Sequence, residues 1–355
     1  MATYALLKNP RYTQVSFKDF DMLMHTELFI VCTKLSNPIE HIRNEVIGGL
    51  SYVLFDTASL NEEDIKLLSR LSFIYALFEI MGKLFLPITK NPDYFLGEDL
   101  SGILKYLGKT NELFTRLMLN LATVHITESA PLNILDPLAG KATTLFESLM
   151  QKHNAYGIEI DLKVAQESNT YLKKYLETAK YKHTTHAERV TVQAEGQRFT
   201  ATRYQIDAAP NKQLEKQGET RHFEIVAGDT RYATSYFKKN FFDAIIADLP
   251  YGIQHGSFSV KNSRGSRNSK KSSNVGITRN PLELLAESLP EWVKILKPKG
   301  VIVLAWNHFI VSRDEIKDVL KQNGLSIPDI YKDFNFLHRV DQAIERDLII
   351  VSTHS

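Results

Sequence analysis

The clearest indication of the fold is one stretch of the sequence, F-F-D-A-I-I-A-D-L-P-Y-G, at positions 241–252. Its first half is short and apolar, which is typical of a strand buried in a parallel sheet. Its second half contains an aromatic residue and three turn formers, Asp248, Pro250 and Gly252. Ligands of open α/β sheets bind where the strands end. We therefore predict a buried strand over Phe242–Ala247 and functional residues directly after it.

The chain from about Asn133 onward repeats this alternation. Short strand-like runs alternate with longer segments of helical spacing, the pattern of a parallel sheet with crossover helices. The other strand-like runs are Asn133–Leu135, Ala155–Ile158, Phe223–Val226 and Gly300–Ala305. The helical segments are Thr143–His153, Asp161–Leu176, Asn280–Leu296 and Ser312–Asn323.

The end of the chain breaks the alternation. Ile330–Leu337 and Asp347–Thr353 are strand-like, and the short polar segment between them is too short for a helix. We expect the two runs to pair antiparallel at the sheet edge. Five parallel strands followed by such a hairpin are the layout of a Rossmann-like methyltransferase sheet, so the fold class is α/β.

Two insertions interrupt this plan. In the first, Lys180–Arg221, alternation on both sides of Glu195-Gly196 predicts a β-hairpin. The second, Ser257–Arg279, is rich in serine and basic residues and has no acid, so we expect a mobile loop. Its basic residues are candidates for contacts with nucleic-acid phosphates, although an idle solvated insertion is an equal alternative: Lys261, Arg264, Arg267, Lys270 and Lys271.

We divide the chain into three parts. Residues 1–90 are expected to form a smaller mixed domain with a possible role in RNA binding, with Asp56–Leu68 helical and Leu71–Ile80 strongly apolar. Residues 91–125 are expected to hold a linker and a helix that precedes the first strand of the sheet. Residues 126–355 are expected to form the methyltransferase domain with both insertions, 180–221 and 257–279.

Composition restricts the class of protein. The 43 basic and 41 acidic residues nearly balance, so affinity for nucleic acid must come from local clusters. The single cysteine, Cys32, excludes an intramolecular disulfide and any multi-cysteine metal site, which indicates a cytoplasmic protein. We expect no membrane-spanning segment, and the histidines show no metal-binding spacing, so we expect no metal. The oligomeric state stays open.

Acids follow the first three strands of the expected sheet. The first strand runs into D-P-L-A-G-K-A-T-T-L-F-E, which starts at Asp136 and leads through a glycine turn into a helix. Glu159 ends the second strand, where a carboxylate can accept hydrogen bonds from ribose hydroxyls. Asp229 follows the third strand, where it can accept a hydrogen bond from an adenine amino group or cap a turn. Three acids in this order favour a nucleoside cofactor.

The turn D-L-P-Y, Asp248 to Tyr251, resembles the (D/N/S)-P-P-(Y/F) signature of S-adenosylmethionine-dependent methyltransferases that modify exocyclic amino groups of bases. The first motif resembles that of the RNA methylases related to the THUMP-associated tRNA guanine-N2 methyltransferases. The segment T-N-E-L-F-T-R-L-M-L-N-L-A, from Thr110, resembles the helix that covers the cofactor in these enzymes, so the resemblance implies a cofactor-covering helix within residues 91–125. The resemblance implies a Rossmann-like fold and formation of N2-methylguanosine in tRNA. It implies that S-adenosylmethionine is bound by Asp136, Pro137, Ala139, Gly140, Glu159, Ile160, Gly228, Asp229, Thr230, Asp248, Asn111 and Phe114.

The chemistry of amino-group methylation explains the turn. An exocyclic nitrogen is a poor nucleophile because its lone pair is delocalised into the ring. The Asp248 carboxylate and the Leu249 carbonyl oxygen can each accept one amino hydrogen, which stabilises positive charge as the methyl group arrives. Pro250 keeps the turn rigid and contributes no N–H, and Tyr251 can stack on the base. These four residues are our catalytic candidates.

The chain departs from the family pattern in the first motif. Ala142 stands at the second glycine, and Ala139 and Lys141 replace a cysteine and a threonine. Two alternatives therefore stay open: an adenine-N6 or cytosine-N4 DNA methyltransferase, which shares D-L-P-Y, and a catalytically silent nucleic-acid-binding subunit, suggested by Ala142. The missing THUMP signature leaves the RNA class open.

Other residues carry weaker signals. His338 and Arg339 are candidates for phosphate contacts or for a solvated turn. Trp306, Asn307 and His308 are candidates for the base pocket, or for core packing and capping.

Overall fold

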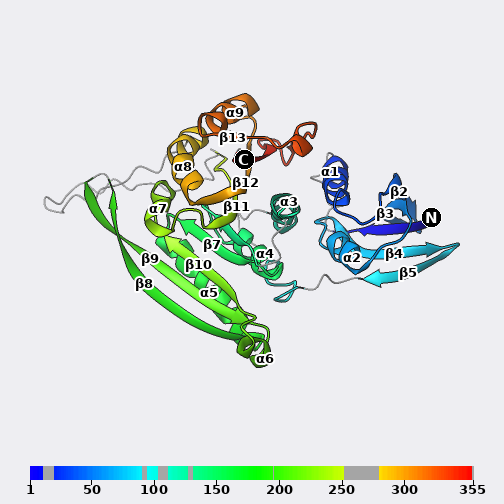
Figure 1. Ribbon diagram of the computed structural model, residues 1–355, viewed down its shortest axis with the longest axis horizontal. Helices are drawn as coiled ribbons and strands as arrows, with labels where there is room; N and C mark the ends of the chain where they lie inside the picture. Colours follow the sequence, from blue (N-terminus) through cyan, green and yellow to red (C-terminus); the bar gives the residue numbers. More distant parts are fainter. Residues whose placement is uncertain are drawn as a thin grey trace.

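The described part of the chain forms two separate β-sheets, a small one near the N-terminus and a large one (Figure 1). A computed structural model describes residues 1–10, 20–89, 94–102, 111–126, 131–194, 196–251 and 280–353. The two sheets are linked by α3 (Glu112–Thr123), which packs against α1 (Phe20–Cys32) of the N-terminal part and against strands of the large sheet. Among the described helices, none is long and apolar enough to cross a membrane.

The large sheet has the strand order of a Rossmann-like methyltransferase, β13-β15-β12-β11-β6-β7-β10-β9-β8. Neighbours from β12 to β10 pair parallel, and β15 pairs antiparallel with β12. The parallel strands are β6 (Asn133–Asp136), β7 (Asn154–Glu159), β10 (Arg221–Ala227), β11 (Phe242–Asp248) and β12 (Leu296–Asn307). All five predicted parallel strands and the α/β fold class are confirmed.

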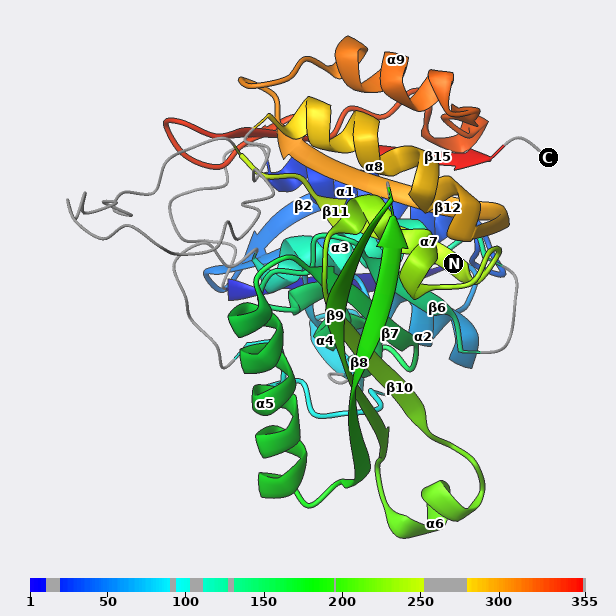
Figure 2. The same cartoon turned by 90° about the vertical axis from the view of Figure 1, so that its left-hand side faces the viewer.

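Helices cover both faces of this sheet. Alternate residues of β12 point to opposite faces of the sheet. Val303 packs with α3 on one face, and Leu304 packs with α8 (Pro281–Ile295) on the other. Figure 2 shows α8 and α9 on one side of β12 and α1 and α3 on the other. The four helices predicted between strands are confirmed as α4 (Thr143–Met150), α5 (Leu162–Thr178), α8 (Pro281–Ile295) and α9 (Arg313–Gln322). Shorter helical segments are α6 (Lys212–Lys216), η2 (Thr230–Tyr232), α7 (Ala233–Tyr236) and η3 (Asp329–Tyr331).

The C-terminal hairpin is only partly as expected. The second run forms β15 (Glu345–Thr353), but the prediction of a strand over Ile330–Leu337 is wrong. Two short strands pair with β15 instead, β13 (Leu325–Ser326) and β14 (His338–Arg339). The physical reason is tertiary: Tyr331 is buried and donates a hydrogen bond from its hydroxyl to the carbonyl oxygen of Leu121 in α3, at 2.9 Å. This anchor holds the segment in the core rather than in the sheet.

The first insertion forms the predicted hairpin, β8 (Lys182–Ala194) and β9 (Gln197–Ala209). Its turn lies where predicted, since Ala194 pairs with Gln197 and Gly196 has a φ of +73°. The hairpin also extends the large sheet, because β9 pairs antiparallel with β10. The second insertion, 257–279, and its five candidate phosphate-binding residues lie outside the described residues.

The N-terminal sheet is antiparallel, with the order β2-β3-β1-β4-β5. Its strands are β1 (Ala2–Lys8), β2 (Glu40–Ile47), β3 (Leu50–Thr57), β4 (Ile74–Met81) and β5 (Leu84–Thr89). With α1 and α2 (Glu62–Ser69), the first four strands have the β-α-β-β-α-β order of a split βαβ motif. The helix expected over Asp56–Leu68 is shorter at its start, because Asn61 and Asp64 form a capping box that begins α2.

Candidate active site

The candidate site lies at the carboxyl edge of the large sheet, where three strands end in acids. Asp136 ends β6, Glu159 ends β7 and Asp248 ends β11. The three carboxyl groups lie close enough to interact, since Asp248 and Glu159 both contribute to the raised pKa of Asp136. The structure therefore brings together acids that are 112 positions apart in the sequence, counted from Asp136 to Asp248.

Asp136 is almost fully buried at the start of the first turn. Its Oδ1 accepts a hydrogen bond from the backbone N–H of Leu138 at 3.0 Å, and Thr144 adds a side-chain hydrogen bond. Burial nevertheless raises the pKa of Asp136 to about 7, with a smaller effect from the two neighbouring carboxylates. This edge of the sheet is thus an acidic environment in which a nearby positive charge would be stabilising.

The first turn packs tightly against the second strand. The backbone N–H of Ala139 donates to the carbonyl oxygen of Ile158 at 2.9 Å. A Cβ atom on Gly157 would lie 2.9 Å from the Cβ of Ala139, so only glycine fits there. Ala142, which precedes α4, has a φ of +62°. This left-handed conformation is the physical reason that a glycine suits the position.

Glu159 is tied to the same turn by backbone hydrogen bonds. Its Oε2 accepts from the N–H of Gly140 and its Oε1 from the N–H of Asp161, each at 2.8 Å. Burial raises the pKa of Glu159. Each carboxylate oxygen has two lone pairs, so each retains the capacity to accept a further hydrogen bond from a ligand hydroxyl. Pro137 lies in the turn, and the side chain of Ile160 is exposed beside Glu159.

Asp229 lies at the same edge, but its carboxylate already forms an ion pair. Its carboxylate caps η2 by accepting from the N–H of Arg231, and it forms a bidentate ion pair with the Arg231 guanidinium at 3.0 and 2.6 Å. These hydrogen bonds raise the pKa of Arg231. The Thr230 hydroxyl accepts from the indole N–H of Trp292, and Gly228 packs against the ring of Tyr236. An adenine amino group would have to share or displace the arginine.

The D-L-P-Y turn follows β11 as predicted. The N–H of Leu249 donates to the carbonyl oxygen of Ala305 at 2.8 Å, and its side chain is buried, which fixes the turn to β12. Pro250 is exposed. The Tyr251 hydroxyl lies 2.7 and 2.8 Å from the two carboxylate oxygens of Asp248, to which it donates. Burial, followed by the Asp248 charge, raises the pKa of Tyr251 well above its ordinary value. The Tyr251 hydroxyl is thus directed at the Asp248 carboxylate.

Arg346, in β15, is a site residue that the sequence analysis missed. Its Nε donates to the Tyr251 hydroxyl at 2.7 Å, and its Nη2 lies 4.0 Å from Asp248 Oδ2. Its guanidinium also stacks on the Phe114 ring, with the Cζ atom 4.2 Å from the ring centroid. The only sequence signal was a basic residue at the start of a strand, which is common on surfaces. Here the Arg346 side chain is 8% exposed.

The structure separates the roles of Asn111 and Phe114. Asn111 caps α3 through its side chain, which accepts from the N–H groups of Leu113 and Phe114. Phe114 reaches the site through Arg346 and His338, whose ring centroid is 5.3 Å from its own. Among the weaker candidates, Trp306 is buried and donates to Val311, which supports the packing interpretation.

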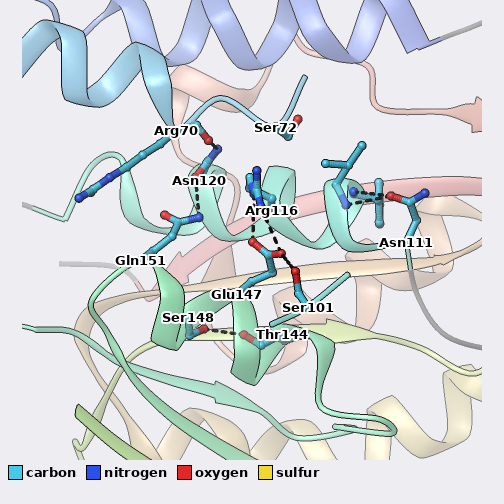
Figure 3. A network of polar contacts seen from close by, with 12 residues as sticks. Arg70, Ser72, Ser101, Asn111, Arg116, Asn120, Thr144, Glu147, Ser148 and Gln151 are labelled. Atoms are coloured by element: carbon cyan, nitrogen blue, oxygen red, sulfur yellow. Dashed lines mark hydrogen bonds and ion pairs between the residues drawn. The ribbon is translucent and has the colours of Figure 1, made fainter. Parts of the chain in front are cut away.

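A network of buried polar residues holds α3 in place (Figure 3). Arg116 of α3 forms an ion pair with Glu147 of α4 at 3.0 Å, and Ser101 donates to the same carboxylate. Asn120, one turn further along α3, donates to Glu27 of α1 at 2.6 Å and accepts from Gln151. The helix that carries Phe114 is therefore connected both to the first-motif helix and to the N-terminal part.

A cavity of about 550 Å³ lies away from the acids at the strand ends, at the opposite edge of the sheet. It is bordered by the start of β6, the end of α4 and residues of α2 and α3, among them Leu132, His153, Leu67 and Asn120. None of the acids that follow the strands lines it. In the part of the chain that the structure describes, no group of three or more His, Cys, Asp or Glu residues is arranged to hold a metal ion.

Comparisons with known proteins show weak likeness. No protein-family model matches the chain, and no curated protein matches its sequence. Similar solved structures include TrmN from Thermus thermophilus (11% identity, 100% of both chains covered, TM-score 0.40). Others are an rRNA methylase from Streptococcus thermophilus (8% identity, 70% of this chain and 100% of that chain, TM-score 0.35) and magnesium protoporphyrin IX methyltransferase from Synechocystis (12% identity, 70% and 87%, TM-score 0.36).

Proposed function

We propose that the protein is an S-adenosylmethionine-dependent methyltransferase that modifies an exocyclic amino group of a nucleic-acid base, namely guanine N2 in tRNA. The observation that carries the proposal is the placement of the D-L-P-Y turn at the carboxyl edge of a Rossmann-like sheet, beside two further carboxyl groups. The choice of guanine in tRNA rests on the resemblance of the first motif.

The residues at this edge fit S-adenosylmethionine. Three neighbouring carboxyl groups, Asp136, Glu159 and Asp248, repel one another when ionised, and a ligand with sulfonium and ammonium charges relieves that repulsion. Asp136 would face the cationic end and Glu159 the ribose hydroxyls, because its two oxygens each keep acceptor capacity. When bound, the cofactor supplies an electrophilic methyl group.

Asp248 and Leu249 would bind and activate the amino group of the base. The Asp248 carboxylate and the Leu249 carbonyl oxygen accept the two amino hydrogens, which localises the nitrogen lone pair and stabilises the positive charge that develops. The rigid turn contributes by orientation, because misplacement of the amino group lowers the rate steeply. Tyr251 supplies the stacking surface.

Methyl-transfer assays test this proposal directly. Purified protein is incubated with labelled cofactor and unmodified tRNA, rRNA or DNA, and the product nucleosides are identified by mass spectrometry. We expect N2-methylguanosine in tRNA. Label found only in DNA would overturn the RNA assignment in favour of a DNA amino-methyltransferase. Calorimetry that detects no cofactor binding at millimolar concentration would instead indicate a silent binding subunit.

Replacing Asp248 separates catalysis from cofactor binding. We expect Asp248→Ala to abolish methyl transfer while cofactor affinity stays within a few fold, because the main partner of the carboxylate is the target base. Turnover and calorimetry measure the two effects. Asp314→Ala is a matched control, since the Asp314 side chain is 91% exposed on α9. A variant of Asp248 that keeps most of its turnover would refute the catalytic role.

A further inference from the structure

An exposed aromatic side chain lies just past the carboxyl end of β12. Phe309 follows Asn307, the last residue of that strand, and is 50% exposed. The guanidinium of Arg339 lies over its ring, with the Cζ atom 5.0 Å from the ring centroid. Arg339 is itself exposed. The two side chains thus form a stacked cation–π pair in contact with solvent.

Both members of the pair are held in position by hydrogen bonds. The Arg339 guanidinium donates to the carbonyl oxygens of Asp341 and Gln342 in the turn after β14. The backbone N–H of Phe309 donates to the side-chain oxygen of Asn307 at 3.2 Å, and the Asn307 amide donates to Ala343 in the facing turn. An isolated exposed apolar side chain needs no explanation. A rigid aromatic–guanidinium pair, however, is a preorganised surface.

The pair lies on the same edge of the sheet as the candidate active site. Arg339 pairs with Glu345 in β15, Arg346 pairs with Asn307 in β12, and Asp248 pairs with Ala305 in the same strand. Arg339 and Asp248 are therefore three strands apart, about 14 Å at the usual spacing between strands, and also three residues apart along the strand direction, about 10 Å. This separation suits a nucleotide near the target base in the same strand of nucleic acid, rather than the target base itself.

We propose that Phe309 and Arg339 form a docking surface for an unpaired RNA nucleotide that flanks the methylated base. Single-stranded bases stack on aromatic rings and on guanidinium planes, and the arginine charge attracts the adjoining phosphate. The surface deepens the proposed function and rests on it for the identity of the RNA. It also gives a role to Arg339, for which the sequence allowed either a phosphate contact or a place in a solvated turn.

Binding measurements without cofactor test the surface independently of methyl transfer. Fluorescence anisotropy is recorded with a labelled ten-nucleotide single-stranded RNA and with the same sequence as a duplex. We expect Phe309→Ala to weaken single-strand binding by about 5- to 150-fold, the range for loss of one stacked base, and to leave duplex binding within twofold. Arg339→Gln should weaken binding and reduce the dependence of log affinity on log salt by about one unit.

Matched variants distinguish stacking from a change in the fold. Phe309→Leu keeps an apolar side chain and should lose the same affinity, whereas Phe309→Trp should restore it. Arg198→Gln on β9 is a control, because Arg198 is exposed away from this turn. Melting temperature and cofactor affinity should match those of the unaltered protein. Unchanged affinity of Phe309→Ala and Phe309→Leu for single-stranded RNA would overturn the proposal.

The outcomes also separate the docking surface from the proposed function. Loss of single-strand binding in Phe309→Ala, together with no methyl transfer by the unaltered protein, would support the surface and refute the enzyme assignment. Methyl transfer by the unaltered protein, together with unchanged single-strand binding in Phe309→Ala, would support the enzyme assignment and refute the docking surface. An affinity loss confined to single-stranded DNA of the same sequence would overturn the assignment of RNA as the partner.

Discussion

At the scale of single residues, the D-L-P-Y turn shows how far residue type alone defines a role. The sequence indicates an acceptor, a rigid turn and a stacking ring. In the structure, Tyr251 also donates its hydroxyl proton to Asp248 and accepts from Arg346. The Asp248 carboxylate therefore already has a donor, and an incoming amino group would have to share Asp248 with Tyr251 or displace it.

Substitutions at Tyr251 test this competition. We expect Tyr251→Phe to keep turnover within about tenfold and to lower KM, because the ring is kept and the competing hydroxyl is removed. Tyr251→Ala should lower kcat/KM by about 5- to 150-fold, since it removes a stacking contact of about 1–3 kcal/mol. Steady-state kinetics with the unmodified substrate RNA measures both. A Tyr251→Phe variant as impaired as Tyr251→Ala would show that the hydroxyl, rather than the ring, is required.

Asp136 makes stability depend on pH. Its pKa is raised to about 7 in the folded protein from an ordinary value of 3.8, chiefly by burial. Between about pH 4 and 7 the folded state thus holds a proton that the unfolded chain releases, so the Asp136 contribution to stability falls as pH rises through this window. Asp136→Asn lacks this contribution. As pH rises through the window, the free energy of unfolding of the variant should therefore rise by up to about 4 kcal/mol relative to that of the unaltered protein.

Urea denaturation at several pH values measures that gain. The difference in free energy of unfolding between Asp136→Asn and the unaltered protein should change between pH 4 and 7 and level off above. Asp314→Asn, at an exposed site, should show no such change. A difference for Asp136→Asn that is constant over this range would contradict the raised pKa.

At the scale of elements, α3 connects the site to the rest of the protein. Its first turn contributes Phe114, which stacks on Arg346. Its middle contributes Arg116, whose side chain is 6% exposed and pairs with a Glu147 side chain that is fully buried. A helix with charged groups in a core is poorly identified from hydrophobic periodicity, because the pattern assumes that charges face water. The partner of Arg116 can be identified only once the position of α4, which carries Glu147, is known.

The Arg116–Glu147 pair provides a prediction for this element. Removing one partner leaves a buried charge without its counter-charge, so Arg116→Met should lower the free energy of unfolding by about 3–5 kcal/mol. The double variant Arg116→Met, Glu147→Leu should be less destabilised than the sum of the single variants, because no lone charge remains. Chemical denaturation of all four proteins measures the coupling. Additive effects would mean that the two charges do not interact.

At the scale of the whole molecule, the two sheets share one core. Buried residues of α1, α3, β11 and β15 pack in a single cluster that includes Leu28, Leu117, Ile246 and Leu348. Glu27 of α1 is fully buried, and its carboxylate accepts from Ser72 and from Asn120 of α3. The N-terminal part is thus attached to the larger sheet by apolar packing and by a buried polar contact.

Truncation tests the shared core. A fragment that starts at residue 94 exposes the apolar side of α3 and removes the partner of Asn120, so we expect it to melt at a lower temperature and to bind a hydrophobic dye. Differential scanning fluorimetry and dye binding measure this. Glu27→Gln in the full chain, which loses only the charge, should be less affected. A fragment that melts like the full protein would show that the sheets are energetically independent.

Local sequence determined most of the elements of the large sheet. Strands such as β11 and helices such as α5 follow from patterns within about twenty residues, and the acids Asp136, Glu159 and Asp248 follow from their positions at strand ends. The chain order of the parallel strands and the antiparallel β15 was also predictable, because short apolar runs with helices between them allow few arrangements.

Tertiary structure decided what depends on contacts between distant parts of the chain. Arg346 reaches Tyr251, 95 positions away in sequence, and Tyr331 is held by Leu121, 210 positions away. The β8–β9 hairpin joins the sheet only because β10 offers its open edge. Sequence patterns report whether a residue is buried and with what periodicity, whereas the partner of a buried polar group is set by packing. The acids of the site were therefore predictable, and the residues that position them were not.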